Sequence, residues 1–510
     1  MPAKRPNILL LMVDQMTVKA MPSYCRSGDP AGARTPHLSA LAERSVVFDA
    51  AYCNSPLCAP SRFSFMTGQL PSAIGAYDNA ADLAADTPTF AHYLRLAGYR
   101  TALAGKMHFC GPDQLHGFEE RLTTDIYPAD YGWTVDWERP EHRPTWYHNM
   151  SSVTEAGPVI RTNQLDFDEE AHFTARRFLF EQARSDDQRP FCLVASFTHP
   201  HDPYATPPAY WNLYRDEDID LPEVSIAAEE QDPHSKRLRR VYDLEGRTIG
   251  EDQIRRARRA YYGSISFVDA QIGSLLQTLE ETGLDDDTIV VFCGDHGDML
   301  GERGLWYKMS WFEGSARVPL MIKAPGDFTP RRIAQSVSLV DLLPTLAELA
   351  SDGQAPAYAA PLDGRSLLPH LSGSAGHDEV FGEYMGEGAI APLLMIRRDR
   401  FKYVCSAPDP EQLFDLVADP QEMTNLAQDP TQKNVLTGFR KEATARWDQA
   451  ALRKSVLASQ RRRRLVDAAM KQGKLHSWDH QPQRDAAQLY MRNHLDLDDL
   501  ERLSRLACRE

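Results

Sequence analysis

The apolar positions in the N-terminal part of the chain follow two periods. Residues 8–13 form an unbroken apolar run, which predicts a strand buried on both faces of a parallel sheet. Residues 99–103, 191–197 and 288–292 predict three further strands. Across residues 252–282, apolar side chains from Tyr261 to Leu279 step by three and four, so we predict a long amphipathic helix that ends at Gly283. Strands that alternate with helices indicate an α/β fold with a central, mostly parallel sheet.

Two Thr-Pro pairs indicate where shorter helices begin, because Pro is favoured at the first helical position. Thr35-Pro36 predicts a helix to about Arg44, and Thr87-Pro88 predicts a helix that Gly98 follows. From about residue 375 the pattern changes to short strands, such as residues 401–404, then to polar helices and a charged tail. Because single cores rarely grow beyond roughly 300 residues, we expect a large domain over residues 1–374 and a smaller α+β domain with a tail over residues 375–510.

Composition limits the partners and the compartment. The 510 residues carry a formal net charge of −16, which argues against a nucleic-acid or anionic-membrane partner. The eight cysteines form neither a C-x-x-C pair nor a zinc-type spacing, and they are typical of reduced intracellular thiols. The apolar run at residues 8–13 is too short for a signal peptide or a membrane span. We therefore expect a cytoplasmic protein.

Two aspartates lie where an α/β sheet binds ligands. Asp14 and Asp295 each follow the C-terminal end of a predicted strand, which is the ligand edge of an open α/β sheet. Carboxylates at this edge would suit a hard divalent cation. A single Asp in such a place is more often a turn residue or a helix cap, so both interpretations stay open on this pattern alone.

The sharpest motif is CAPSR at residues 58–62, which Thr67-Gly68 follows. A bare C-x-P-x-R string is equally typical of a cysteine at a turn before a helix. With its Thr-Gly extension the motif resembles the signature of the type I sulfatases, whose cysteine is converted to formylglycine. Segments at residues 340–346, 363–368 and 413–420 also resemble sulfatase segments, so the resemblance covers nearly the whole chain. It implies an alkaline-phosphatase-like fold, hydrolysis of sulfate esters, and a formylglycine-generating or equivalent enzyme that matures Cys58.

The conversion has a chemical reason. A thiol is a good nucleophile, but its sulfate adduct would have no easy exit. A hydrated aldehyde carries two hydroxyls on one carbon, so that one attacks sulfur and deprotonation of the other expels sulfate by cleaving the C–O bond.

The resemblance also implies a metal site and a set of polar catalytic residues. Its metal ligands are Asp14, Cys58, Asp295 and His296. Many sulfatases have a second aspartate where this chain has Gln15, and an asparagine where it has His296. Ca²⁺ is the expected ion, and Mg²⁺ and Mn²⁺ stay open because an imidazole makes the site softer.

The remaining catalytic residues come from separate segments. They are Arg62 after the nucleophile, Lys106 and His108 in a G-K-x-H string, His201 in a P-H-x-P-Y string, and Lys308. Singly, such residues are more often structural. As an ordered set, the three cations would neutralise the sulfate. We expect His201 with Lys308 to protonate the departing alkoxide and His108 to assist release.

Longer strings narrow the resemblance. Residues 111–132, 478–482 and 490–494 resemble the bacterial choline sulfatases. That branch of the family implies choline O-sulfate as the small-molecule substrate and a homo-oligomer, either a dimer or a tetramer. A quaternary ammonium group favours aromatic faces and carboxylates. By resemblance, Trp133, His148, Glu387 and Asp498 surround it, and the tail that carries Asp498 would reach a neighbouring subunit.

Other interpretations stay open at this point. Aromatic side chains as dense as those in residues 131–148 are more often core residues than a cation site. The nearest rival function is an arylsulfatase or a phosphonate or phosphodiester hydrolase with the same catalytic core. A different class of answer is a binding protein in which Cys58 remains a thiol.

Overall fold

The computed structural model describes residues 5–25, 32–324, 328–351, 353–490 and 496–506. Within these ranges the main element is a mixed sheet of eight strands, with β9 antiparallel to both of its neighbours and every other pair parallel. In spatial order the strands are β10 (Arg331–Ser338), β2 (Val46–Tyr52), β9 (Leu320–Lys323), β8 (Thr288–Gly294), β1 (Asn7–Val13), β6 (Phe191–Phe197), β3 (Arg100–Gly105) and β4 (Glu120–Arg121).

The centre of this sheet confirms the predicted buried strands. Every residue of β1, β6 and β8 is buried, as the unbroken apolar runs required. β1 pairs in parallel with both β6 and β8. The carboxyl ends of these strands therefore open at the same edge of the sheet.

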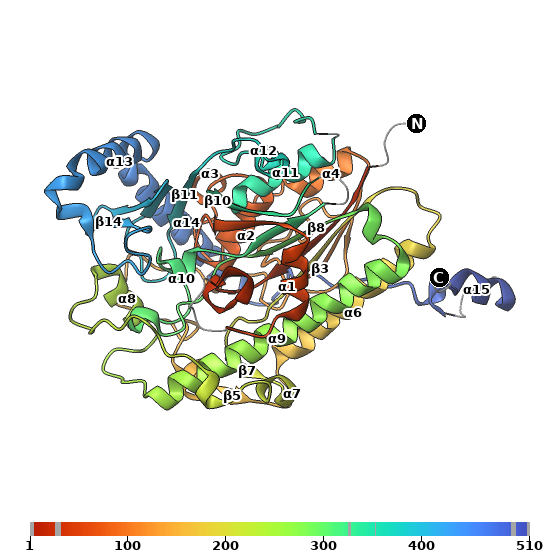
Figure 1. Ribbon diagram of the computed structural model, residues 1–510, viewed down its shortest axis with the longest axis horizontal. Coiled ribbons are helices and arrows are strands. Elements are labelled where there is room, and N and C mark those ends of the chain that lie inside the picture. Colours follow the sequence, from red (N-terminus) through yellow and green to blue (C-terminus); the bar gives the residue numbers. More distant parts are fainter. Residues whose placement is uncertain (1–4, 26–31, 325–327, 352, 491–495, 507–510) are drawn as a thin grey trace.

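Helices cover both faces of the sheet (Figure 1). One layer contains α1 (Pro36–Glu43), α6 (Asn163–Arg184) and α9 (Glu251–Thr282), and α9 contacts the other two. The other layer contains α2 (Cys58–Thr67), α4 (Phe90–Leu96) and α11 (Leu342–Leu349). The predicted long helix and its end at Gly283, which has a φ of 72°, are confirmed.

The helix predicted from Thr87-Pro88 begins later than expected. Its first residue is Phe90, and Thr89 is the N-cap. The Thr89 side chain and the His92 side chain form a capping box, which satisfies backbone donors at the start of the helix. The Thr-Pro rule gave the right helix and the wrong start.

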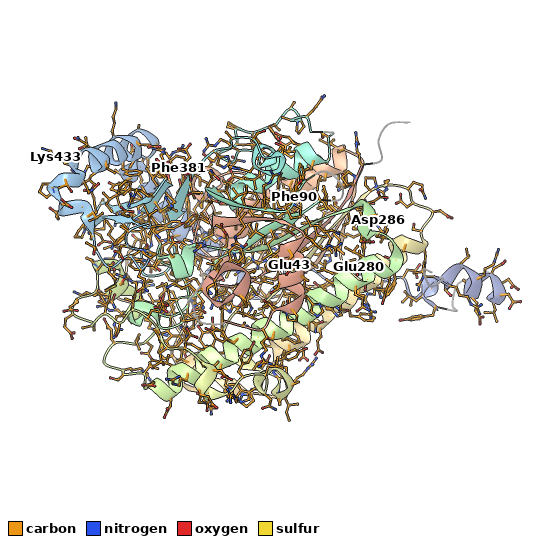
Figure 2. All side chains as sticks on the ribbon, viewed as in Figure 1. Glu43, Phe90, Glu280, Asp286, Phe381 and Lys433 are labelled. Atoms are coloured by element: carbon orange, nitrogen blue, oxygen red, sulfur yellow. The ribbon has the colours of Figure 1, made fainter. Side chains whose placement is uncertain are left out.

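A second sheet follows in the C-terminal part of the chain. It is an antiparallel meander of β11 (Glu379–Tyr384), β12 (Leu393–Arg398), β13 (Phe401–Ser406) and β14 (Asp409–Asp415). Two helices, α13 (Lys433–Arg446) and α14 (Gln449–Met470), come next, and Figure 2 labels Phe381 on this sheet and Lys433 at the start of α13. The Arg446 guanidinium lies 3.6 Å from the Phe381 ring centre.

The C-terminal tail leaves the body of the molecule. Helix α15 (Leu497–Ser504) and its side chains project away from both sheets (Figures 1 and 2). Residues 491–494 of the tail string lie outside the described residues. Among the residues that the structure describes, we find no helix with the length and apolarity needed to cross a membrane.

Candidate active site

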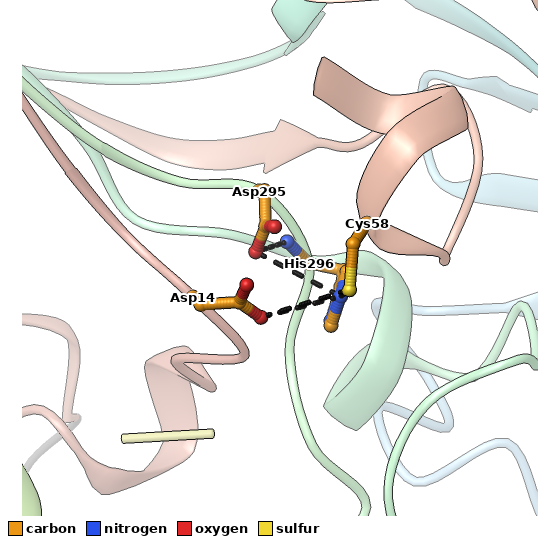
Figure 3. Close-up of side chains that lie close together, drawn as sticks. All are labelled: Asp14, Cys58, Asp295 and His296. Atoms are coloured by element: carbon orange, nitrogen blue, oxygen red, sulfur yellow. Dashed lines mark hydrogen bonds and ion pairs between the residues drawn. The ribbon is translucent and has the colours of Figure 1, made fainter. Parts of the chain in front are cut away.

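Four predicted ligands meet at the carboxyl edge of the main sheet (Figure 3). Asp14 follows β1, whereas Asp295 and His296 follow β8, and the last residues of these two strands pair with each other. Cys58 is the first residue of α2. Donor atoms of the four side chains all lie within 4.8 Å of one another, and the side chains are buried.

The distances in this cluster fit one ion. His296 Nε2 lies 3.2 Å from Cys58 Sγ, 3.6 Å from Asp14 Oδ1 and 3.8 Å from Asp295 Oδ1. Burial lowers the pKa of His296, so its ring stays neutral and can present a lone pair. Burial alone would raise the pKa of Asp14, but Lys106, His201, Arg62 and His296 hold that pKa well below its usual range.

The donor set therefore could hold one divalent metal ion. Two buried carboxylates supply hard oxygen donors for Ca²⁺ or Mg²⁺, and the imidazole is compatible with Mn²⁺. A formylglycine at residue 58, which the sequence resemblance implies, would place an oxygen where the Cys58 sulfur lies. The site would then offer three hard donors and one nitrogen.

Two buried cations flank the cluster. Arg62 lies one turn after Cys58 on α2, so both point from the same face. Its Nε donates to Asp295 Oδ2 at 2.8 Å, and its Nη2 donates to Asp14 Oδ2 at 3.2 Å. Lys106, just after β3, donates to the same Asp14 oxygen. Burial would lower the pKa of Lys106, but Asp14 raises it, so the ammonium stays charged.

A third cation lies at the centre of a separate hydrogen-bond network. Lys308 Nζ lies 2.6 Å from Gln15 Oε1, 2.6 Å from His201 Nε2 and 3.1 Å from His148 Nε2. Burial lowers the pKa of His201 well below its usual value, and Lys308 lowers it further. Gln15, which departs from the common sulfatase pattern, thus binds Lys308.

The choice of His201 over His199 is consistent with this geometry. His199 Nδ1 lies 2.6 Å from Asp168 Oδ2, and its ring packs against Phe267 at a centroid distance of 4.9 Å. His199 therefore has a structural environment, whereas His201 contacts Lys308.

An aromatic wall continues from the cluster. The Tyr127 ring centre lies 4.3 Å from Lys106 Nζ, 5.0 Å from the His108 ring and 4.9 Å from the Trp133 ring. Trp133 in turn stacks on Trp146 at 6.2 Å. Burial lowers the pKa of His108, and the neighbouring Cys58 offsets part of this decrease.

Glu387 is buried near Tyr147, which contacts Trp146 of this wall, whereas Asp498 is exposed on α15. Glu387 follows β11 and is 2% exposed, and its Oε2 has no hydrogen-bond partner among the described residues. Burial raises the pKa of Glu387 to about 7. Its charge also contributes to the raised pKa of Tyr147, next to Trp146. Asp498 is exposed on α15, so the structure does not bring it to the other predicted residues.

Sequence reasoning missed several residues of the site. Asp125 Oδ2 accepts the backbone N–H groups of Met107 at 3.0 Å and His108 at 2.9 Å. Asn79 Oδ1 accepts the backbone N–H of Ala59 at 3.0 Å. Asp125 and Tyr127 lie in the string at residues 111–132, which was the available signal, whereas no signal in the sequence pointed to Asn79.

Comparison with known proteins places the chain in a family. A model described as Sulfatase matches residues 6–352, and a model described as Choline sulfatase enzyme C terminal matches residues 454–506. A choline-sulfatase of Rhizobium meliloti (strain 1021) is 50% identical, over 98% of this chain and 98% of the relative. An arylsulfatase of Clostridium perfringens (strain 13 / Type A) is 30% identical, over 82% of this chain and 89% of the relative.

The fold also resembles that of a solved hydrolase structure. The crystal structure of the phosphonate monoester hydrolase of Agrobacterium radiobacter matches with a TM-score of 0.67 and 26% identity, over 89% of this chain and 96% of that chain. This likeness confirms the alkaline-phosphatase-like fold that the sequence resemblance implied. The matched models, the identities and the Cys58 cluster agree, and the chain belongs to the sulfatase family.

Proposed function

We propose that the chain hydrolyses choline O-sulfate to choline and sulfate, with a formylglycine hydrate at Cys58 and one divalent metal ion. The observation that carries the proposal is the buried Glu387, with its unpartnered oxygen, beside the aromatic wall that begins at the Cys58 cluster. The choline-sulfatase relative at 50% identity supports the substrate. In this proposal residues 1–374 carry the reaction, and residues 375–510 contribute Glu387 and the tail.

A formylglycine hydrate at residue 58 would supply one hydroxyl for attack on sulfur and a second whose deprotonation would release sulfate. A bound ion, held by Asp14, Asp295, His296 and residue 58, would act as a Lewis acid on these oxygens. Arg62 and Lys106 keep a positive field beside residue 58, because their own carboxylate partners hold them charged in a buried place. The sulfate oxygens thus meet cations that need no reorganisation.

The departing alcohol needs a proton, because an alkoxide is a poor leaving group. Lys308 Nζ lies 2.6 Å from His201 Nε2, so the two side chains could together deliver this proton. His108, neutral through burial and adjacent to Cys58, is placed to accept the proton of the second hydroxyl during release.

The cation end of the substrate would lie against Trp133 and Trp146, with His148 at the rim and Glu387 behind. Aromatic faces and a carboxylate attract a trimethylammonium group that cannot donate ordinary N–H hydrogen bonds. Glu387 would ionise fully when the cation binds, because an opposite charge favours its charged form.

We propose that Asp498 acts between subunits of a cytoplasmic dimer or tetramer. Helix α15 leaves the body and exposes Leu497 and Leu503, which a neighbouring subunit would cover. The test mixes two inactive forms, Cys58→Ala with an intact tail and Asp498→Asn with an intact nucleophile. Restored choline O-sulfate turnover after subunit exchange supports the arrangement, and no restoration in a verified mixed oligomer contradicts it.

The experiment that tests the function compares choline O-sulfate with p-nitrophenyl sulfate, using protein expressed aerobically with a maturation enzyme. We expect a strong preference for choline O-sulfate and a peptide mass at residue 58 that corresponds to formylglycine. A preference for the aryl ester would overturn the substrate and leave the nucleophile. No turnover of either by converted protein would favour the phosphonate or phosphodiester hydrolase instead. An unconverted Cys58 in protein that turns over choline O-sulfate would overturn the nucleophile.

A further inference from the structure

We propose that the buried ion pair between Asp78 and Arg463 sets the net charge behind the cation pocket, so that helix α14 determines how strongly the site selects a cationic alcohol. Arg463 is a positioning residue in this proposal, because it acts through Asp78. The inference rests on the proposed function, and the test below distinguishes the failure of one from the failure of the other.

The pair is fully enclosed. Arg463 Nη2 donates to Asp78 Oδ2 at 2.9 Å, and Nη1 donates to Asp78 Oδ1. Asp78 is 0% exposed and Arg463 is 7% exposed. Burial would lower the pKa of Arg463, but Asp78 raises it in this two-point geometry, so the guanidinium stays charged.

The same helix holds the segment that carries the aromatic wall. Arg463 Nη1 donates to Thr134 Oγ1 at 3.4 Å, directly after Trp133. Three residues earlier on α14, Gln460 Oε1 accepts the backbone N–H of Trp137 at 3.0 Å. Arg463 therefore lies between α14, the Trp133 segment and Asp78.

Asp78 also lies close to the pocket on its other side. It directly precedes Asn79, which binds the start of the Cys58 helix. The Asp78 charge is among the causes that raise the pKa values of Glu387 and Tyr147, in both cases after burial. The other charged or titratable groups that act on Glu387 or respond to it are Lys308, Tyr147, Tyr242 and Tyr384.

The charge balance gives the two partners opposite effects. With both present, the Arg463 charge offsets part of the Asp78 charge at the substrate cation, and Glu387 supplies most of the attraction. Removal of the Asp78 charge leaves an unbalanced guanidinium that repels the trimethylammonium group. Removal of the Arg463 charge leaves an unbalanced carboxylate that attracts it. Such charges are poorly screened in a buried site.

The experiment uses two substrates of the same shape, choline O-sulfate and 3,3-dimethylbutyl sulfate, in which carbon replaces the charged nitrogen. The measured quantity is the ratio of their kcat/KM values, so general damage to the active site cancels. We expect Asp78→Asn to lower this ratio by about tenfold, Arg463→Met not to lower it, and the double variant to return towards the wild-type ratio. Arg463→Lys, which keeps the charge, should retain most of the wild-type ratio.

A matched control is the pair Arg398 and Glu442, whose atoms lie 2.7 Å apart between β12 and α13. Arg398→Met and Glu442→Gln should leave the ratio unchanged. A large wild-type ratio that Asp78→Asn does not change would overturn this inference alone, as would a double variant that stays as low as Asp78→Asn. A wild-type ratio near one would overturn the proposed function and this inference with it. If Arg463→Met does not fold, Asp78→Asn and the double variant still decide.

Discussion

Lys308 Nζ lies 2.6 Å from His201 Nε2, and in the proposed mechanism this contact would hold the proton for the departing alcohol. An ammonium group has three N–H donors, and those of Lys308 face Gln15 Oε1, His148 Nε2 and His201 Nε2. The His201 ring would then accept at Nε2 and carry its own proton on Nδ1. The His201 Nδ1 contact with the Asp202 carbonyl oxygen at 2.7 Å agrees with this tautomer. In the proposed mechanism Lys308 would therefore donate the proton, and His201 would orient it.

Replacement of His201 should harm alkyl esters more than aryl esters. We expect His201→Gln to lower kcat/KM for choline O-sulfate by about 10²- to 10³-fold. The loss for p-nitrophenyl sulfate should be much smaller, because nitrophenolate departs without a proton. His199→Gln is the matched control, since His199 is equally buried and binds Asp168 instead. Equal losses for both esters would contradict a leaving-group role.

Asp14 should be required for metal binding. Removal of its charge deletes one of two buried carboxylates at the cluster, so Asp14→Asn should lose the bound ion. Metal content per chain after dialysis measures this directly, and turnover should fall on the order of 10³-fold. Asp186→Asn, an exposed change, should retain both. Chelator should abolish wild-type turnover, and added Ca²⁺, Mg²⁺ or Mn²⁺ should restore it. Full metal content in Asp14→Asn would refute this site.

Glu387 should make cation recognition depend on pH. Its pKa of about 7 means that the carboxyl loses its charge as the pH falls through neutrality. The kcat/KM ratio of choline O-sulfate to 3,3-dimethylbutyl sulfate should therefore fall from about pH 8 to about pH 6. Glu387→Gln should lower the ratio at high pH and abolish this pH dependence. A ratio in Glu387→Gln that still follows the wild-type pH curve would exclude Glu387 as the group that titrates.

His116 should contribute to the loss of folding stability in acid. Burial lowers its pKa from 6.5 to about 4, although Asp113 opposes the shift. Between these two values the unfolded chain binds a proton that the folded chain does not. Stability is therefore lost as the pH falls from about 6.5 to about 4, by about 3 kcal/mol.

The matched variant is His116→Asn, because Asn tolerates the positive φ of 40° at this residue. As the pH falls from about 6.5 to about 4, the thermal unfolding midpoint should decrease more steeply for the wild type than for His116→Asn. Parallel curves for the two proteins would show that His116 does not titrate on unfolding.

The site residues at the carboxyl edge of the main sheet could be predicted from the sequence, because short-range patterns determine where the strands end. Unbroken apolar runs indicated β1 and β8, and Asp14 and Asp295 follow them directly, so parallel pairing brings them together. The predicted start of α4 was wrong because a capping box, which depends on side-chain contacts, determines where this helix begins.

Contacts between segments that lie far apart in the sequence could not be predicted from it. Tyr127 and Asp125 lie beside Lys106 and His108 only because the loop after β3 folds back over the strand end. The Asp78–Arg463 pair joins residues from opposite ends of the chain, and no periodicity relates them. Asp498 was predicted from resemblance alone, and the single chain leaves it exposed on α15.

The burial of α2 also limits when Cys58 can be modified. Every residue of this helix is buried, and Cys58 is 1% exposed. If Cys58 is converted as the proposed function requires, the enzyme that oxidises it would have to act while residues 58–67 are still an accessible, unfolded stretch of the nascent chain. Folding and oxidation then compete for the same segment, and a molecule that folds first keeps an unreachable thiol. The fraction of active molecules in a preparation would thus depend on the rate of Cys58 oxidation relative to the rate of folding.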